Sequence, residues 1–296
     1  MNGFLIVDKP AGMTSHDVVN AVRRLAGIRR VGHTGTLDPL ATGVLVLALG
    51  AATRLVQFID GNHKTYHATL RLGETTTTYD ADGDLVERRP VTVSQAEIEA
   101  ALVGFRGDIT QIPPMYSAVK VKGQKLYKLA RQGKEIERAA RPVTIHRLNV
   151  LDWALPEVTI EVICSAGTYI RSLAHDLGQT LGCGAHLTAL TRIAAGEFRL
   201  EDAYALEVLR TLAQAGRLAD VVLSPETALT ELPVIVLTPE QVQAVRFGQM
   251  VTLNNAPDTE MAQARDAAGR LVAVLRPVEP GVWRPKLVFT SAEGQP

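Results

Sequence analysis

The chain has 296 residues, of which 46% are hydrophobic and 21% are charged, and its 31 basic residues balance its 31 acidic ones. These values are ordinary for a globular protein of one large or two smaller domains, and the overall charge indicates no particular partner. The longest apolar run, residues 43–52, is about half as long as a membrane span, and the first residues lack the pattern of a secretion signal. Cys164 and Cys183 are not in CxxC spacing. We therefore expect a cytoplasmic protein with reduced thiols and no membrane contact.

The stretch from residue 31 to 43, VGHTGTLDPLATG, contains three glycines, a proline and three threonines. So many helix and strand breakers predict a shaped loop, and the apolar run that follows it is short enough to be a buried strand. Asp38 lies between Leu37 and Pro39, whose apolar side chains would limit the hydration of its carboxylate. Asp38 is therefore the candidate reactive group, although an Asp-Pro pair also simply initiates turns, and that alternative stays open here.

The N-terminal segment is predicted to form a short strand at residues 4–7, a turn and a helix. Ser15 fits the N-cap of that helix, apolar residues follow at helical spacing, and Gly27 fits its end. Four arginines lie just before the glycine loop: Arg23, Arg24, Arg29 and Arg30. Such a run is usually a solvated surface, but beside a reactive loop it could hold phosphates.

Residues 64–72 alternate so that the apolar side chains and Tyr66 share one face, which predicts a strand with a tyrosine on its apolar side. A polar, turn-rich loop follows at residues 73–83. Ser94 and Glu97 then match a capping box, which predicts the start of a further helix.

The stretch from residue 120 to 147 is strongly basic, with nine basic and two acidic residues. Tyr127 lies within it, Tyr116 lies just before it, and two glycines interrupt it. A flexible basic segment with aromatic side chains suits a polyanion with stackable bases, so we favour RNA contact over a solvated helix face. The candidate contacts are Lys120, Lys122, Lys125, Lys128 and Arg131.

A β-branched run at residues 158–164 predicts a strand, which leads into a turn and a helix whose first turn carries Tyr169 and Arg171. A helix that begins at a strand end is a common place for site residues. Leu190 lies in the apolar segment that follows.

Polar, proline-containing sequence near residues 223–232 is typical of a domain boundary. Beyond it, Thr238 fits the N-cap of a short helix that Gly248 ends, and short strand candidates surround that helix. We expect a catalytic domain at residues 1–228 and a small, mostly β domain at residues 229–296.

Several common site types are missing from the sequence. There is no GxxxxGK[ST], GxSxG or HExxH motif, and the seven histidines are scattered without ligand spacing near a cysteine. We therefore expect catalysis without a metal ion or an organic cofactor.

The sequence closely resembles the TruB family of bacterial tRNA pseudouridine-55 synthases, in six ordered stretches within the first 200 or so residues. These stretches are residues 8–15, 32–43, 64–66, 80–83, 113–118 and 167–171. The resemblance implies an α+β pseudouridine synthase fold with a mixed, largely antiparallel sheet. It also implies an RNA-clamping loop at about residues 115–147 and a C-terminal domain similar to the PUA RNA-binding domain. One departure is Ile193, where many relatives carry threonine.

The same resemblance implies roles for individual residues. Asp38 would be the nucleophile, Arg171 would pair with it, and Tyr66 would stack on the flipped base and take part in transfer of the C5 proton. The residues implied to bind the substrate nucleotide are His33, Tyr66, Tyr169 and Leu190, and those expected to contact the RNA backbone include Lys9.

The expected function is isomerisation of the uridine at position 55 in the T-loop of tRNA, by a monomer that flips the base out of the RNA. Two alternatives remain open. The chain could act mainly as an RNA-folding chaperone that uses the same cleft and basic segment, or it could modify another RNA. Intact Asp38, Tyr66 and Arg171 argue against loss of catalysis.

Overall fold

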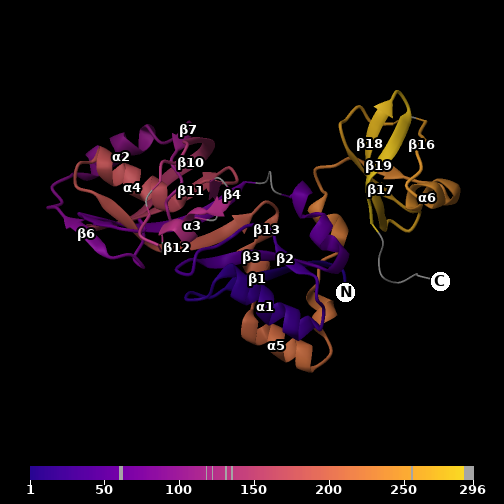
Figure 1. Ribbon diagram of the computed structural model, residues 1–296, viewed down its shortest axis with the longest axis horizontal. Helices are drawn as coiled ribbons and strands as arrows, with labels where there is room; N and C mark the ends of the chain where they lie inside the picture. The colour runs from indigo at the N-terminus through magenta and orange to yellow at the C-terminus, as the bar shows by residue number, and fades with distance from the viewer. Residues whose placement is uncertain are drawn as a thin grey trace.

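The computed structural model describes residues 1–59, 63–117, 119–121, 123–130, 132–134, 136–254 and 256–289. It is elongated, with a large mixed sheet at one end and a small β domain at the other (Figure 1). No helix in this described part is long and apolar enough to cross a membrane.

The large sheet has ten strands, eight of them in the order β14-β1-β3-β12-β4-β11-β10-β7. Only the pairs β1/β14 and β3/β12 are parallel, so the predicted mixed, largely antiparallel sheet is confirmed. The strands are β1 (Gly3–Lys9), β2 (Val31–His33), β3 (Thr42–Leu49), β4 (Lys64–Leu72), β7 (Gly107–Gln111), β10 (Arg141–Ala154), β11 (Glu157–Cys164), β12 (Ala185–Ala195), β13 (Phe198–Arg199) and β14 (Tyr204–Ala205).

Alternation along the central strands gives the sheet two apolar faces. In β1, Leu5 and Val7 pack on one face with the helices, whereas Phe4 and Ile6 pack on the other. The helices are α1 (Ser15–Ala26), α2 (Gln95–Val103), α4 (Ile170–Thr180) and α5 (Leu206–Gln214). Two small hairpins extend the fold: β5 (Glu74–Thr76) with β6 (Leu85–Arg88), and β8 (Lys120–Val121) with β9 (Gln124–Lys125), which leads into α3 (Leu126–Ala130).

The C-terminal domain is a five-stranded sheet in the order β15-β17-β18-β19-β16 with one α-helix. Side chains of this domain, among them Leu271 and Phe289, pack with Phe4 and Ile6 on the second face of the large sheet. Arg54 also donates from Nη1 to the carbonyl oxygen of Val288 at 2.9 Å. Its elements are β15 (Val234–Val236), α6 (Pro239–Arg246), β16 (Val251–Thr252), β17 (Ala262–Arg265), β18 (Leu271–Glu279) and β19 (Val282–Val288).

Short 3-10 helices connect several of these elements. They are η1 (Gly50–Arg54), η2 (Val56–Phe58), η3 (Leu200–Asp202), η4 (Leu218–Val221) and η5 (Pro225–Ala228).

Two local predictions at the N-terminus were wrong. The N-cap of α1 is Thr14, because its hydroxyl accepts from the backbone of Asp17, whereas Ser15 is the first helical residue. Residues 31–43 are not one loop: Val31–His33 pairs with β3 as β2, and β3 already begins at Thr42. The glycines did not prevent strand formation at the two ends of this stretch. Its first residues pair with the apolar strand β3, and its last residues are the start of β3 itself.

Other local predictions are confirmed. Gly27 ends α1 in the left-handed conformation, with φ 63°. The capping box of Ser94 and Glu97 is present in α2, and Thr238 caps α6. Each of these signals depends only on residues within one turn of the helix end, which is why sequence was sufficient.

Candidate active site

The loop that carries Asp38 is fixed by hydrogen bonds on both sides of that residue. The Ser15 hydroxyl donates to the Leu37 carbonyl at 2.9 Å and accepts from the Leu37 amide at 2.7 Å. Behind the loop, Gly12 donates to the Pro39 carbonyl at 2.9 Å. The buried Leu37 side chain anchors the loop in the core, while the Asp38 side chain remains 37% exposed. The backbone therefore presents the carboxylate from a rigid base.

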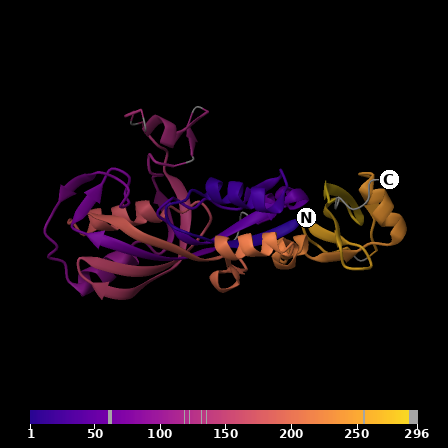
Figure 2. The same cartoon turned by 90° about the horizontal axis from the view of Figure 1, so that it is seen from below.

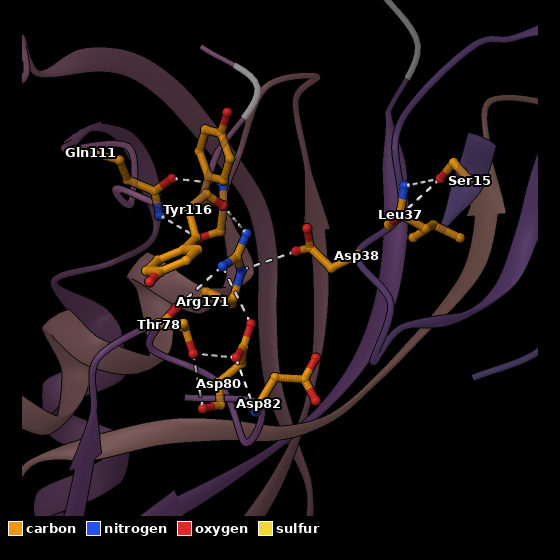
Figure 3. A network of polar contacts seen from close by, with 10 residues as sticks. Ser15, Leu37, Asp38, Thr78, Asp80, Asp82, Gln111, Tyr116 and Arg171 are labelled. Atoms are coloured by element: carbon orange, nitrogen blue, oxygen red, sulfur yellow. Dashed lines mark hydrogen bonds and ion pairs between the residues drawn. The ribbon is translucent and has the colours of Figure 1, made fainter. Parts of the chain in front are cut away.

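Arg171, in the first turn of α4, contacts four groups around the site (Figure 3). Its Nε forms an ion pair with Oδ2 of Asp38 at 3.0 Å, and its Nη1 forms a second one with Oδ2 of Asp80 at 3.3 Å. Nη1 also donates to the Thr78 carbonyl at 3.2 Å, and Nη2 donates to the Tyr116 carbonyl at 2.8 Å. With its side chain only 5% exposed, the guanidinium is held in one orientation toward Asp38.

The electrostatic environment of Asp38 is a balance of opposing effects. Burial raises the pKa of the carboxyl above 3.8, the Arg171 guanidinium opposes that shift, and Asp80 adds to it. Arg171 thus favours a charged carboxylate in a place where desolvation disfavours one. A carboxylate that is partly shielded from water and has a fixed counter-ion is well suited to nucleophilic attack.

Tyr66 lies on β4, as its alternation predicted, and its side chain is buried. Burial raises the pKa of its hydroxyl above 10.0, and Arg192 opposes the shift through its charge and a hydrogen bond. Arg192, 1% exposed, also donates from Nε to the Val44 carbonyl at 2.6 Å and from Nη2 to the Gly35 carbonyl at 3.1 Å. One buried arginine therefore links the tyrosine to both ends of the Asp38 loop.

These groups line a cavity of about 330 Å³. Asp38, Tyr66, Tyr169 and Leu190 all contribute to its wall, as does Arg171. Asp38 supplies the only carboxylate among the described residues that line it. The structure thus brings five of the candidate site residues together from four separate segments of the chain.

Tyr169 is positioned by a side chain from β7. The Tyr169 amide donates to Oε1 of Gln111 at 3.0 Å, and Nε2 of Gln111 donates back to the Tyr169 carbonyl at 3.3 Å. Gln111 is 2% exposed, so this pair orders the start of α4 without a side-chain N-cap (Figure 3).

A second cavity of about 770 Å³ adjoins the first and shares Asp38 and Arg171 with it. His33, the remaining candidate for substrate binding, lies in this second cavity with Tyr116 and Tyr127. His33 is therefore near Asp38 but is not part of the smaller cavity.

The candidate RNA-contacting residues occupy different environments. Lys9 is fully buried, and its Nζ donates to the Pro10 carbonyl at 2.8 Å and to the Pro39 carbonyl at 3.3 Å. Its ammonium group therefore binds the loop that carries Asp38 and is not exposed to an RNA phosphate. Arg23 is partly engaged with its own segment, donating from Nε to the Arg29 carbonyl at 3.1 Å.

The other arginines of that run, Arg24, Arg29 and Arg30, are exposed. The basic hairpin of β8, β9 and α3 projects from the body of the large domain (Figure 2). Lys120, Lys125 and Lys128 lie on these elements, whereas Lys122 and Arg131 lie outside the described residues. The strand β10 begins at Arg141, so the projecting segment ends before the basic stretch does.

Sequence reasoning did not identify Asp80 or Arg192 as site residues. Asp80 is in a turn-rich polar loop, where an aspartate is ordinary, and Arg192 is in an apolar segment. Arg192 offered one signal, a charged residue within an apolar segment, whereas the polar sequence around Asp80 offered none beyond the family-like stretch 80–83. Within the described residues, no group of three or more His, Cys, Asp or Glu side chains could hold a metal ion.

Comparison with known proteins assigns the chain to a family. The model of the TruB family pseudouridylate synthase N-terminal domain matches residues 23–170, and that of the tRNA pseudouridylate synthase B C-terminal domain matches residues 171–230. The tRNA pseudouridine synthase B of Pseudomonas aeruginosa is 46% identical over 98% of this chain and 97% of that protein. The chain belongs to the TruB family.

A second TruB relative, the tRNA pseudouridine synthase B of Actinobacillus pleuropneumoniae, is 47% identical over 86% of this chain and 85% of that protein. Among solved structures, the archaeal box H/ACA sRNP Nop10-Cbf5 complex contains a chain that is 26% identical, with a TM-score of 0.74 over 98% of this chain and 87% of that one. The boundary between the two TruB family models falls at residue 170, which lies within the large domain described above.

Proposed function

We propose that this chain converts the uridine at position 55 of the tRNA T-loop into pseudouridine, with Asp38 as the nucleophile. The observation that carries the proposal is the ion pair of 3.0 Å between Arg171 and Asp38 at the wall of a cavity that Tyr66 also lines. Membership of the TruB family and the names of its tRNA-modifying relatives support the same substrate class.

The reaction needs no co-reactant because it is an isomerisation. The Asp38 carboxylate attacks C6 of the base or C1′ of the ribose, and the N1–C1′ bond breaks. The uracil turns within the cavity, a C5–C1′ bond forms, C5 loses its proton and N1 gains one. On the C1′ route the carboxylate leaves C1′ as the C5–C1′ bond forms, and on the C6 route it leaves C6 after that bond has formed, so the enzyme is regenerated with no net change in electrons.

The surrounding residues have distinct proposed roles. Arg171 keeps Asp38 ionised and oriented, as its counter-charge opposes the effect of burial on the pKa of Asp38. Tyr66 stacks on the flipped base, and its hydroxyl relays the C5 proton in the neutral form, because burial raises its pKa. Tyr169 and Leu190 complete the cavity wall.

Affinity for tRNA must come largely from outside this cavity. Flipping a base costs on the order of a few kcal/mol, and stacking on an aromatic ring returns about 1–3 kcal/mol, so the two nearly cancel. We assign the phosphate contacts to the exposed arginines before β2 and to the lysines of the projecting hairpin. His33 occupies the adjoining cavity, where an unflipped neighbour or the extruded nucleotide can lie.

We also propose that the enzyme is a cytoplasmic monomer with a domain boundary at residues 228/229. The five-stranded sheet begins at Val234, after η5 ends at Ala228. We propose that this small domain binds RNA in the manner of a PUA domain.

The test is release of tritium from tRNA labelled at C5 of its uridines, with Asp38→Asn as the matched variant. We expect release by the native chain alone, equal tRNA binding by both proteins, and no release when position 55 carries cytidine. Release by both proteins would remove Asp38 from the mechanism. Absence of release from both, with binding intact, would favour the RNA-chaperone alternative, and release from the cytidine-55 tRNA would indicate another target uridine.

A further inference from the structure

Tyr79 has an unusual backbone conformation beside the active site. Its φ is 64°, and it is the only non-glycine residue of the described part with a positive φ. This left-handed region is unfavourable for a residue with a Cβ atom, and more so for a bulky one. Such a conformation persists only where the surrounding contacts impose it.

Three contacts hold Tyr79 in place. Its amide donates to the Thr76 carbonyl at 3.3 Å, and its carbonyl accepts from the Leu187 amide of β12 at 3.0 Å. Its ring stacks on the imidazole of His175, with the ring centroids 3.9 Å apart and the planes inclined by 14°. The backbone bonds fix the turn, and the stacked ring fixes the turn against α4.

The two residues that flank Tyr79 both bind Arg171. The Thr78 carbonyl accepts from Nη1 at 3.2 Å, and Oδ2 of Asp80 lies 3.3 Å from the same nitrogen (Figure 3). The left-handed residue between them turns the chain so that a carbonyl and a carboxylate converge on one nitrogen atom.

His175 lies one helical turn after Arg171 on α4, and therefore on the same face of that helix. The helix thus contacts the 78–80 turn twice, through the charges of Arg171 and through the ring of His175. The Nδ1 atom of His175 is buried and has no hydrogen-bond partner within the described part of the chain. Its ring is consequently held by stacking, with no polar contact to Nδ1.

We propose that Tyr79 and His175 are positioning residues whose stacked rings hold the 78–80 turn against Arg171 and thereby fix the guanidinium that orients Asp38. Neither residue lines the cavity of Asp38 or the adjoining one, so neither acts by touching the substrate. This inference rests on the proposed function of Asp38 and Arg171.

The first test compares single-turnover rates and tRNA affinity for variants that remove or keep each ring. Tyr79→Gly permits the positive φ but lacks the ring, and His175→Ala lacks the imidazole, so each is expected to lower the single-turnover rate about 10- to 100-fold. Their dissociation constants for tRNA should stay at the native value. Tyr79→Phe and His175→Phe keep a stacked pair of rings and should retain the native rate.

The second test asks whether the effect passes through Asp80. If the rings act by holding the 78–80 turn, Tyr79→Gly should slow the native enzyme and add nothing to an Asp80→Asn variant. A purely structural role would instead lower the thermal midpoint and slow both backgrounds equally.

Native rates in both Tyr79→Gly and His175→Ala would overturn the inference, as would equal slowing by Tyr79→Phe and Tyr79→Gly. Asp38→Asn measured in parallel separates this failure from that of the proposed function. If Asp38→Asn has no activity while the ring variants are fully active, only the positioning role of Tyr79 and His175 is rejected. If Asp38→Asn turns over, the proposed mechanism itself falls.

Discussion

Arg171 holds Asp38 through a single ion pair, 3.0 Å between Nε and Oδ2, while its other two nitrogens are occupied by Asp80, Thr78 and Tyr116. The guanidinium is therefore a fixed junction between the Asp38 loop and two segments on the other side of the cavity. Asp38, the proposed nucleophile, is thus paired with a residue that is itself held by three further contacts.

The geometry of this junction predicts that a lysine cannot replace Arg171. Arg171→Lys keeps the charge but lacks the planar fork that serves four partners at once. We expect a single-turnover rate at least about 100-fold lower, with native affinity for tRNA. Arg199→Lys, at an exposed position on β13, is the matched control and should be fully active. Native turnover by Arg171→Lys would show that charge alone is sufficient.

The environment of Asp38 predicts the pH dependence of the reaction. Because burial raises the pKa of the Asp38 carboxyl above 3.8, the single-turnover rate should rise with pH along a limb whose midpoint lies above 3.8. Asp80→Asn removes a neighbouring negative charge and should move that midpoint to lower pH. A midpoint at or below 3.8 in the native enzyme would contradict the effect of burial.

The same shift affects stability, with a defined sign. A carboxyl whose pKa is raised on folding stabilises the native state below its unfolded pKa, and that contribution is lost as the pH rises through the folded pKa. Relative to Asp38→Asn, the free energy of unfolding of the native chain should therefore fall as the pH increases above 3.8. Denaturant titrations of both proteins across this interval measure the difference, which should be flat if Asp38 titrates normally.

Lys9 provides a test of how the free energy of unfolding changes at alkaline pH. Burial lowers its pKa from 10.5 to about 8, so between these values the unfolded chain binds the proton and the folded chain releases it. The contribution of Lys9 to the free energy of unfolding should accordingly increase with pH over this interval, by up to about 3 kcal/mol. Lys9→Met should abolish this increase.

Since Lys9 is fully buried, Lys9→Met should also leave the salt dependence of tRNA binding unchanged. A reduced salt slope in this variant would show that Lys9 reaches a phosphate after all. The exposed Arg24→Met serves as the comparison, because we expect it to reduce that slope.

The projecting hairpin predicts a larger change in salt dependence. Replacing Lys120, Lys125 and Lys128 together by alanine should weaken tRNA binding and reduce the log–log salt slope by roughly 0.7–0.9 for each phosphate that the variant no longer neutralises. Isomerisation of tRNA that is already bound should continue at the native rate, because we assign to these lysines phosphate contacts only and no part in the chemistry at Asp38. An unchanged slope would assign the phosphate contacts to other parts of the surface.

Local sequence was sufficient for most features that one segment determines, although it placed the N-cap of α1 at Ser15, one residue after Thr14. The alternation in β4 placed Tyr66 on the buried face, and the capping residues of α2 and α6 were correct, because strand faces and helix ends depend on neighbours only a few residues away. The composition of the glycine-rich stretch at residues 31–43 identified Asp38 as a candidate. The resemblance of residues 167–171 to the TruB family identified Arg171 as its partner.

Tertiary structure decided the relationships between distant segments. Asp80 meets Arg171 across 91 residues of chain because β12 pairs with β4 and brings α4 beside the 78–80 turn. The burial of Lys9, the link from Arg192 to Tyr66, and the left-handed Tyr79 against His175 likewise depend on strand register and packing. The local sequence around a charged turn residue is the same whether its side chain is solvated or paired with a buried arginine. Only the folded chain shows which of these environments the side chain has.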